Sequence, residues 1–393
     1  MVKDGRKHLT TDAPATLAVH AGEAPDPTTR AHNLPIFQTA TFSFETADEK
    51  EAAVDAAAEF TPQAYFYTRV GNPTTDALEA KIAALEGAEA AVASSTGMSS
   101  VSASLLAHLK AGDHLIVADD LFIGTQMMFE GDFPKRNIEV TSLPITDLAG
   151  VQAAIKPNTR VIYAELLSNP WNRVTDIPAL AKMAHDAKAI LIIDNTFISP
   201  AAVRPLSMGA DLVLHASTKW ISGHGDALGG VVSGSTALLN PIRRLTDWYG
   251  GTASPFNSWL IARGTRTLPL RVERATENAN KVAAFLEKHE KVEWVRHPSL
   301  ASHPDRAVAE KLLKGNWGGM LAFKPRGVNG DDLGAMRAFS DNLKMCAIAV
   351  SLGEVDTLVY PMPKRGGIFR ISIGIEAADD IIADFSQALD HVR

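Results

Sequence analysis

A lysine set between small residues and glycines is the densest chemical signal in this sequence. Lys219 follows the apolar run of Asp211–His215 and the residues Ala-Ser-Thr, and several glycines come after it. Ligands bind where the strands of parallel sheets end, and a lysine amine there can form an imine with an aldehyde cofactor. The hydroxyl of Thr218 can bind a phosphate. Because a lysine after a strand is also a common surface residue, this segment alone leaves both interpretations open.

Two other segments offer groups that suit a charged ring and a phosphate. Asp194 ends the apolar run ILIID, and a buried carboxylate needs a partner such as a protonated pyridine nitrogen. Capping of a following helix is the alternative. In ASSTGMSS, Gly97 and Met98 precede an apolar helical pattern, whose first backbone N–H groups can hold a phosphate. An ordinary serine-capped helix has the same composition.

Two arginines are candidates for binding anions. Arg69 lies beside Tyr67 in YFYTRVGNPT, before a Gly-Asn-Pro turn, where it can bind an anion or belong to a simple loop. Arg370 stands between Phe369 and Ile371 in a late apolar strand. Its guanidinium can bind a substrate carboxylate with two parallel hydrogen bonds, although an exposed strand arginine is an equal alternative.

The composition limits the class of protein. The 393 residues carry a net charge of −7, which argues against a general binder of nucleic acids or membrane surfaces. The sequence has no signal-peptide core and no apolar run of membrane-spanning length. The one cysteine, Cys346, rules out an internal disulfide and a cysteine-based metal cage. We expect a cytoplasmic protein without a metal site, in which Cys346 is a buried structural thiol.

Short apolar runs alternate with helical patterns between residue 74 and about residue 232. This alternation predicts a mostly parallel sheet that is covered on both faces. Helices such as Ile177–Ala187 are expected between the strands. The strands themselves are predicted at His114–Ala118, Arg160–Ala164, Ile190–Asp194, Asp211–His215 and Gly229–Ser233.

The rest of the chain predicts a second, smaller α+β unit. One long helical region is expected at Ser254–Val282, followed by strands at Gly319–Lys324 and Phe369–Gly374 and a helix at Ala378–Val392. We therefore divide the chain into three parts. They are an N-terminal arm at 1–70, a large α/β domain at 71–261 and a C-terminal α+β domain at 262–393.

Together, and in this order, these segments resemble the Cys/Met-metabolism family of pyridoxal-phosphate enzymes, which includes cystathionine γ-synthases and methionine γ-lyases. The similarity runs from about residue 15 to 390. The motifs that carry it are Tyr67-Thr-Arg69-x-Gly-Asn-Pro-Thr, Ser95-x-Gly97-Met98, Glu165-x-x-Ser-Asn169-Pro170, Asp194-Asn195-Thr196, Ser217-Thr218-Lys219, Gly223-His-Gly-Asp226, Ser351-Leu-Gly353 and Arg370-x-Ser-x-Gly-x-Glu376. The resemblance implies an α/β enzyme of the fold type I pyridoxal-phosphate transferases.

The resemblance also implies roles for the matched residues. Lys219 would hold pyridoxal 5′-phosphate as an imine and then move protons, and Asp194 would pair with the pyridine nitrogen. Arg370 would bind the α-carboxylate of an amino-acid substrate. The remaining implied contacts are Gly97, Met98 and Thr218 on the phosphate, Phe122 stacked on the ring, Asn169 beside the ring hydroxyl and the substrate, Ser351 orienting Lys219 or substrate, and Tyr67 and Arg69 on the phosphate of a neighbouring subunit. The implied assembly is a homotetramer built from two dimers with shared sites.

Several positions depart from the family pattern. Phe122 stands where most members have a ring-stacking tyrosine, and Ala216 replaces a phosphate-binding serine. Val350 mildly favours the methionine γ-lyase type, and the loop at 359–365 carries Lys364 and Arg365, which can face the substrate entrance or be solvated. We expect a γ-lyase acting on a methionine-like amino acid or on a non-sulfur analogue such as canavanine. The alternatives are a γ-replacement synthase, a cystathionine β-lyase, and a cofactor-binding scaffold without catalysis.

Overall fold

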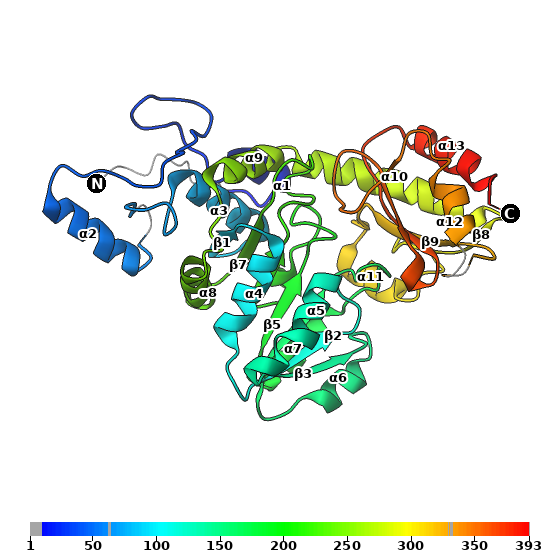
Figure 1. Ribbon diagram of the computed structural model, residues 1–393, viewed down its shortest axis with the longest axis horizontal. Coiled ribbons are helices and arrows are strands. Elements are labelled where there is room, and N and C mark those ends of the chain that lie inside the picture. Colours follow the sequence, from blue (N-terminus) through cyan, green and yellow to red (C-terminus); the bar gives the residue numbers. More distant parts are fainter. Residues whose placement is uncertain (1–9, 62–63, 329, 331–332, 393) are drawn as a thin grey trace.

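The computed structural model describes residues 10–61, 64–328, 330 and 333–392, and these residues form two β-sheets. In Figure 1 the larger sheet lies at the centre and the smaller sheet lies beside it, toward the C-terminus. Each sheet has its own cluster of buried apolar side chains. Within the described residues, no helix is long and apolar enough to cross a membrane.

The larger sheet has seven strands in the order β1-β7-β6-β5-β4-β2-β3. All neighbouring pairs are parallel except those of β7, which runs antiparallel to both β1 and β6. This confirms the mostly parallel α/β fold expected from the sequence. The strands are β1 (Ala90–Ser94), β2 (His114–Ala118), β3 (Glu139–Leu143), β4 (Thr159–Glu165), β5 (Ile190–Asp194), β6 (Leu212–His215) and β7 (Gly230–Gly234).

Helices cover the larger sheet on both faces. Right-handed crossovers put the helices of the β1–β2 and β2–β3 connections on one face and those of the β3–β4 and β4–β5 connections on the other. Accordingly, α4 contacts α5, and α6 contacts α7. The helices of this part are α3 (Pro73–Glu86), α4 (Gly97–His108), α5 (Ile123–Gly131), α6 (Leu148–Ala154), α7 (Ile177–Asp186), α8 (Thr236–Trp248) and α9 (Pro255–Thr265), with short 3₁₀ turns at Pro134–Arg136 and Pro205–Met208.

Local sequence sets the helix ends that border the site. The side chain of Asn72 accepts a hydrogen bond from the N–H of Thr74 at the start of α3, and Gly87 ends that helix with φ of 70°. A left-handed residue at this position is the usual glycine helix stop. Thr96 caps α4 in the same way by accepting from the N–H of Ser99.

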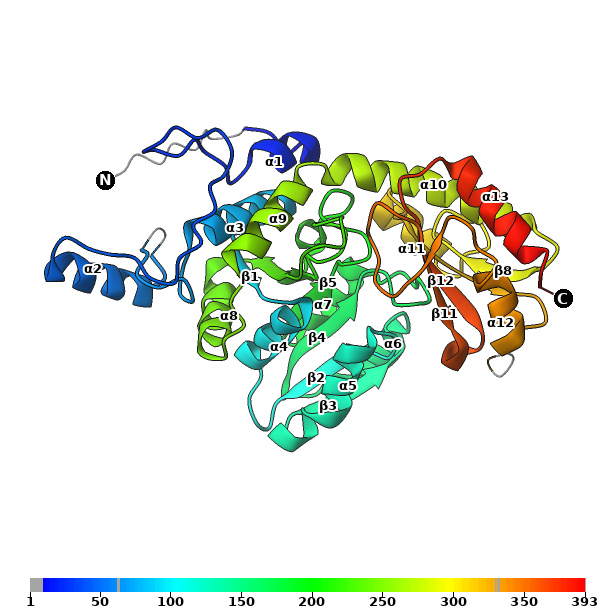
Figure 2. The same cartoon turned by 45° about the horizontal axis from the view of Figure 1, so that its top comes forward.

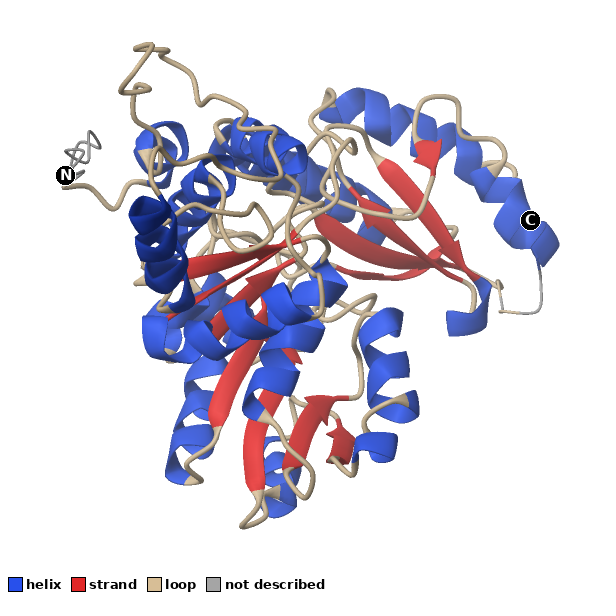
Figure 3. Ribbon diagram, turned by 60° about the vertical axis from the view of Figure 1, so that its left-hand side comes forward, coloured by secondary structure: helices blue, strands red, loops and turns tan. Residues whose placement is uncertain are grey.

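The smaller sheet has five strands in the order β10-β11-β12-β9-β8, and only β10 and β11 are parallel. Figure 3 shows helices along one side of it. Its buried cluster includes Cys346. The elements are β8 (Val292–Arg296), β9 (Met320–Pro325), β10 (Ala347–Ile348), β11 (Leu358–Met362), β12 (Ile368–Ser372), α10 (Leu268–Lys288), α11 (Arg306–Leu313), α12 (Leu333–Ser340), α13 (Ala378–Leu389) and a 3₁₀ turn at Pro363–Arg365.

The long helical region expected at Ser254–Val282 is instead two helices, α9 and α10. The chain breaks at Arg266–Thr267, just before Pro269 in the first turn of α10. Proline cannot donate a helical hydrogen bond and disfavours a helical conformation in the residue before it, so a helix starts there more readily than it continues. Helix α10 contributes Val272 to the first buried cluster and Leu286 to the second. The domain limits at 70 and 261 stay a prediction.

The N-terminal segment holds two helices, of which the first packs against the rest of the chain and the second extends away from both sheets. Helix α1 (Pro14–His20) packs against α3 and α10, and Leu17 joins the first buried cluster. Helix α2 (Ala47–Ala58) lies away from both sheets at the left of Figures 1 and 2. Its single buried residue among those described is Ala57. The segment therefore reaches beyond the body of its own chain.

A buried ion pair anchors the start of this segment. Glu23 Oε1 lies 2.9 Å from Nζ of Lys81, a lysine that is 0% exposed and also donates to the carbonyl of Ala18 at 2.8 Å. Burial lowers the pKa of Lys81, and Glu23 opposes that shift. Removing Glu23 therefore leaves an ammonium group buried without its counter-charge.

We expect Glu23→Gln to lower the free energy of unfolding by about 3 kcal/mol, the usual cost of leaving one partner of a buried pair uncompensated. Urea denaturation followed by circular dichroism measures this change. The matched control is Asp186→Asn, which breaks the exposed pair of Lys182 and Asp186 and should cost less than about 0.5 kcal/mol. Equal losses in the two variants would contradict the prediction.

Candidate active site

A cavity opens at the carboxyl edge of the larger sheet, where β1, β2, β4, β5 and β6 all end. Parallel sheets commonly bind ligands at this edge. Segments of the smaller sheet's part close the cavity from the other side. The structure brings eight of the predicted site residues to its wall: Gly97, Met98, Phe122, Asn169, Asp194, Lys219, Ser351 and Arg370.

Lys219 and Ser351 meet in this cavity from distant parts of the chain. The Lys219 Nζ donates to Ser351 Oγ at 2.7 Å. Burial lowers the pKa of Lys219, and the positive charge of Arg370 lowers it further. Ser351 has a positive φ of 83°, a costly conformation for a residue with a side chain. The amine is therefore fixed in direction and gives up its proton more readily than a surface lysine.

Arg370 lies on β12, and its guanidinium bonds to residues on both sides of the cavity. Its Nη2 donates to the carbonyl of Ser351 at 2.7 Å, and its Nη1 donates to Asn169 Oδ1 at 3.2 Å. The Nε is buried and has no hydrogen-bond partner among the residues that the structure describes. Burial lowers the pKa of Arg370 to about 10, so the group stays charged at neutral pH. An unpaired buried donor on a charged guanidinium suits an incoming carboxylate.

Asp194 ends β5 with its carboxylate held in place. Oδ1 accepts from the N–H of Thr196 at 2.8 Å, and Oδ2 accepts from the hydroxyl of Tyr163 at 3.4 Å. Burial raises the pKa of Asp194, whereas the hydrogen bonds from Thr196 lower it. The alternative reading as a helix cap does not hold, because no helix follows Asp194 directly.

The predicted phosphate end of the site is formed by the start of α4. The first N–H groups of a helix have no partners within it, and Gly97 and Met98 supply them here. A Cβ on Gly97 would lie 2.7 Å from Cβ of Ala216, so only glycine permits this close approach. Thr218 is not on the wall of the cavity. Its Oγ1 accepts from the N–H of Gly229 at 2.9 Å, so its role on a phosphate stays a prediction.

Phe122 begins α5 and presents its ring to the cavity. The ring side chain is 45% exposed, and a Cβ on Gly124 would lie 2.7 Å from it. The backbone N–H of Phe122 donates to Glu165 Oε1 at 2.7 Å. The position of this aromatic ring is therefore tied to the end of β4.

Besides Thr218, the predicted residues Tyr67 and Arg69 also lie outside the wall of this cavity. Arg69 forms an ion pair with Asp247 at the end of α8, and its guanidinium lies 5.6 Å from the centre of the Tyr67 ring. Both side chains are accessible, with Tyr67 38% exposed. Neither residue lines the cavity of Lys219 in the same chain, and their role at a neighbouring subunit stays a prediction.

Sequence reasoning did not assign roles to Glu165, Thr196 and Tyr163. Glu165 and Asp194 are register partners at the ends of adjacent strands, so their side chains project to the same face. The sequence signal for such a residue is an acid at the end of a buried apolar strand. Glu165 ends the run RVIYAE in the same way as Asp194 ends ILIID. Tyr163 could not be found this way because only the fold brings its hydroxyl to Asp194.

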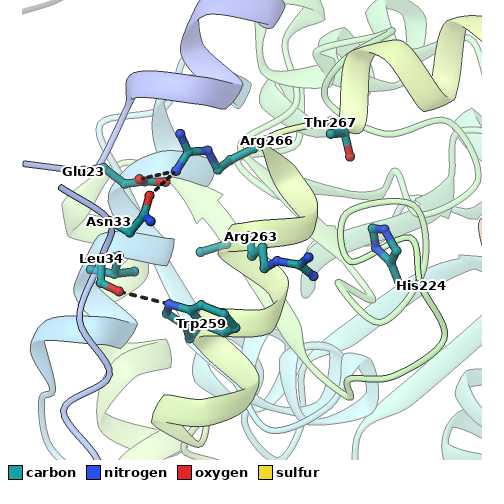
Figure 4. Close-up of a pocket in the computed structure, with 9 residues that line it drawn as sticks. Glu23, Asn33, Leu34, His224, Trp259, Arg263, Arg266 and Thr267 are labelled. Carbon is teal, nitrogen blue, oxygen red and sulfur yellow. Dashed lines mark hydrogen bonds and ion pairs between the residues drawn. The ribbon is translucent and has the colours of Figure 1, made fainter.

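Another cavity lies between the N-terminal segment and α9 (Figure 4). Arg266 bonds both Glu23 Oε2 and Asn33 Oδ1, and the indole N–H of Trp259 donates to the carbonyl of Leu34 at 3.0 Å. None of the predicted site residues lines it. Its contacts fasten the N-terminal segment to the larger domain.

The groups around the main cavity fit pyridoxal phosphate. An amine, an acid, a helix N-terminus, an aromatic face and a buried guanidinium with an unpaired donor all open into one space. This set defines the class of pyridoxal-phosphate enzymes, in which the protein supplies binding, orientation and charge.

Comparison with known proteins agrees. The model of the family described as Cys/Met metabolism PLP-dependent enzyme matches residues 15–390, so this chain belongs to that family. An L-methionine gamma-lyase of Fusobacterium nucleatum subsp. polymorphum is 39% identical over 96% of this chain and 98% of its own length. A canavanine gamma-lyase of Pseudomonas canavaninivorans is 37% identical over 99% of each chain. The crystal structure of metB from Corynebacterium glutamicum has a TM-score of 0.90 at 36% identity, covering 97% of this chain and 98% of that one.

A neighbouring cavity suggests a test of pH dependence. Asp120 lies on its wall, with one carboxylate oxygen buried without a partner and the other bonded by Ser168. Burial raises the pKa of Asp120 to about 6, and the hydrogen bond from Ser168 opposes the shift. Between its ordinary value and about 6, the folded protein binds this proton and the unfolded chain does not. Stability conferred by this group therefore falls as pH rises through that window.

We expect Asp120→Asn to be more stable than the wild type by roughly 1–3 kcal/mol at pH 7.5 and nearly equal to it at pH 4. Chemical denaturation at several pH values measures the difference. Asp119→Asn, next in the chain and exposed, is the control; because the charge of Asp119 adds less than burial does to the raised pKa of Asp120, this variant should show only a small part of the dependence. A constant difference between Asp120→Asn and wild type across this range would contradict the raised pKa.

Proposed function

We propose that this enzyme is a γ-lyase, which eliminates the γ-substituent of an amino acid with the help of pyridoxal 5′-phosphate. Its substrate is a methionine-like amino acid or a non-sulfur analogue such as canavanine. The observation that carries the proposal is that Lys219, Asp194 and Arg370 open into one cavity. The names of the relatives that act on methionine and canavanine support the same reaction class.

Each of the groups that line the cavity has a separate task in this proposal. Bound pyridoxal phosphate supplies an electron-poor ring that makes the Cα–H bond of an attached amino acid acidic. Asp194 would face the ring nitrogen and keep it protonated. Gly97 and Met98 would hold the phosphate through their backbone N–H groups, and Phe122 would lie against the ring.

Lys219 would carry the protons. Burial and the charge of Arg370 lower its pKa, so the neutral amine that a general base requires is more accessible than in a surface lysine. The amine would take the proton from Cα and pass it on, which returns it to the neutral form, and would then take one from Cβ. The γ-substituent would leave with the electrons of its bond as a double bond forms between Cβ and Cγ. The hydrogen bond that Nζ donates to Ser351 Oγ would keep the amine on the reacting side of the substrate.

Arg370 would fix the substrate by its α-carboxylate. Hydrogen bonds to Asn169 and Ser351 already hold the guanidinium in place, so its remaining donors are preorganised. Fixing the carboxylate there orients the Cα–H bond toward Lys219.

The departing group would receive little help from the residue at position 122. Phenylalanine has no hydroxyl that could protonate a leaving thiolate. We therefore favour a leaving group that needs less protonation, of which the oxygen-linked guanidine of canavanine is an example.

We also propose that the enzyme works as a homotetramer of two dimers with shared sites, in the cytoplasm. Trp248 and Tyr249 are 68% and 75% exposed beside the Arg69–Asp247 pair. Large exposed aromatic side chains favour a protein interface. A second copy on this surface would bring Tyr67 and Arg69 to a partner's cavity.

The reaction class is tested by incubating the purified enzyme separately with L-methionine, L-cystathionine, O-acetyl-L-homoserine and L-canavanine. We expect release of a four-carbon 2-oxo acid and ammonia, with canavanine turned over best. Lys219→Ala should lower kcat by at least about 10³-fold, because it removes the proton carrier. Equal or better turnover of a sulfur substrate would refute the canavanine preference. A new thioether amino acid formed in the presence of a thiol would identify a synthase instead.

Shared sites predict complementation between two inactive variants. Lys219→Ala lacks the amine, and Arg69→Ala lacks the proposed contribution to the partner's site. A hybrid dimer would contain one site with both residues, so mixed refolding of equal amounts should restore about a quarter of wild-type activity. Activity assays before and after mixing, with sizing by light scattering, measure this. No recovery in confirmed hybrids would show that each site is built from one chain.

A further inference from the structure

Glu165 connects the two sides of the active site through its carboxyl group. It is the last residue of β4 and is only 6% exposed. Oε1 accepts from the backbone N–H of Phe122 at 2.7 Å, and Oε2 accepts from the backbone N–H of Asn169 at 3.0 Å. Each oxygen thus holds the backbone of a different loop, one after β2 and one after β4.

Both loops lead directly to groups with proposed roles. Phe122 presents the ring-facing aromatic side chain, and no side chain caps α5 at that residue. Asn169 accepts from Arg370, which in turn holds the carbonyl of Ser351, and Ser351 accepts from Lys219. Continuous hydrogen bonding therefore runs from the aromatic face to the reactive amine, with Glu165 at the junction.

We propose that Glu165 is a positioning residue, which sets the aromatic face of Phe122 and the carboxylate site of Arg370 at a fixed separation across the cofactor. The inference rests on the proposed function, since it assigns a separation that matters only when cofactor and substrate are bound. Glu165 acts through Phe122 and Asn169.

The electrostatics agree with this role. Burial raises the pKa of Glu165 well above its usual value, and the negative charge of Asp194 raises it further. Hydrogen bonds from Thr196 and Tyr163 lower the pKa of Asp194 and oppose the effect of burial there. The pKa of Glu165 is raised well above its usual value by burial and by the charge of Asp194, so Glu165 is the acid that takes up a proton more readily.

This assignment makes glutamine an informative replacement. Glu165→Gln keeps the size and removes no charge from a neutral acid, but it retains only one acceptor oxygen. Glu165→Ala loses both acceptors. A hydrogen bond in a protein contributes a factor of roughly 2 to 12 to an equilibrium, so each lost contact should be measurable.

The experiment measures binding of pyridoxal phosphate to the purified protein by equilibrium dialysis, and its visible-region circular dichroism, which reports how the bound ring is held. We expect affinity to fall about fivefold in Glu165→Gln and about 20-fold or more in Glu165→Ala, with an altered dichroic signal in both. Binding of L-norleucine, which has no γ-substituent that can leave, should weaken in parallel because Asn169 and Arg370 are less well fixed. If Glu165→Ala does not fold, Glu165→Gln alone decides the result.

Asp384→Asn is the matched control. Asp384 is 5% exposed and also clamps backbone N–H groups with both oxygens, at 2.8 Å to Lys344 and 2.8 Å to Cys346, but it lies on α13. This variant should lose stability while keeping cofactor affinity and dichroism.

Glu165 variants that bind and orient the cofactor like wild type would overturn the proposal, as would equal effects in Asp384→Asn. A wild-type protein that did not bind pyridoxal phosphate would instead overturn the proposed function, and the positioning role with it.

Discussion

The site depends on hydrogen bonds that cross from one sheet to the other. Arg370 belongs to the five-stranded sheet, yet its two terminal nitrogens bond to Asn169 after β4 and to the carbonyl of Ser351. In the opposite direction, the amine of Lys219, which follows β6 of the larger sheet, donates a hydrogen bond to Ser351 in the part that holds the smaller sheet. Apolar packing also joins the two parts, because Met320 of β9 and Leu352 belong to the buried cluster of the larger sheet. The polar contacts then fix the directions of the substrate-binding and reactive groups.

Two carboxyl groups on neighbouring strand ends add an electrostatic constraint. Like charges in a buried space disfavour joint ionisation, so the protein must hold one acid charged and leave the other neutral. Hydrogen bonds from Thr196 and Tyr163 favour the charged form at Asp194. A neutral carboxyl group still has acceptor lone pairs, so Glu165 can accept from the backbone N–H groups of Phe122 and Asn169. The parallel register of β4 and β5 makes this division of roles possible, since it places both acids on one face.

Much of the fold was predictable because buried strands and helices leave periodic apolar patterns. The strands at His114–Ala118 and Ile190–Asp194 have the predicted limits. The reversed direction of β7 was not predictable, since its apolar residues are the same in either orientation. The break between α9 and α10 was missed although Pro269 marks it, because the apolar pattern continues across the proline.

Sequence motifs named most of the residues that line the cavity, whereas the contacts of individual side chains depend on the fold. Eight predicted residues line the cavity, but the hydroxyl of Thr218 instead bonds to Gly229. Hydroxyl direction depends on a rotamer that sequence does not encode locally. Glu165 was overlooked as a functional group because its partners are backbone N–H groups, which every residue type except proline can supply.

The position of β12 near the end of the chain has a consequence for biosynthesis. Translation delivers Gly97, Asp194 and Lys219 well before Ser351 and Arg370 leave the ribosome. The part that would hold the cofactor can thus be complete while the part that would hold the substrate is still being made. A chain that stops between these segments carries the lysine and the acid, but it lacks the serine that holds the lysine amine and the arginine that bonds to Asn169.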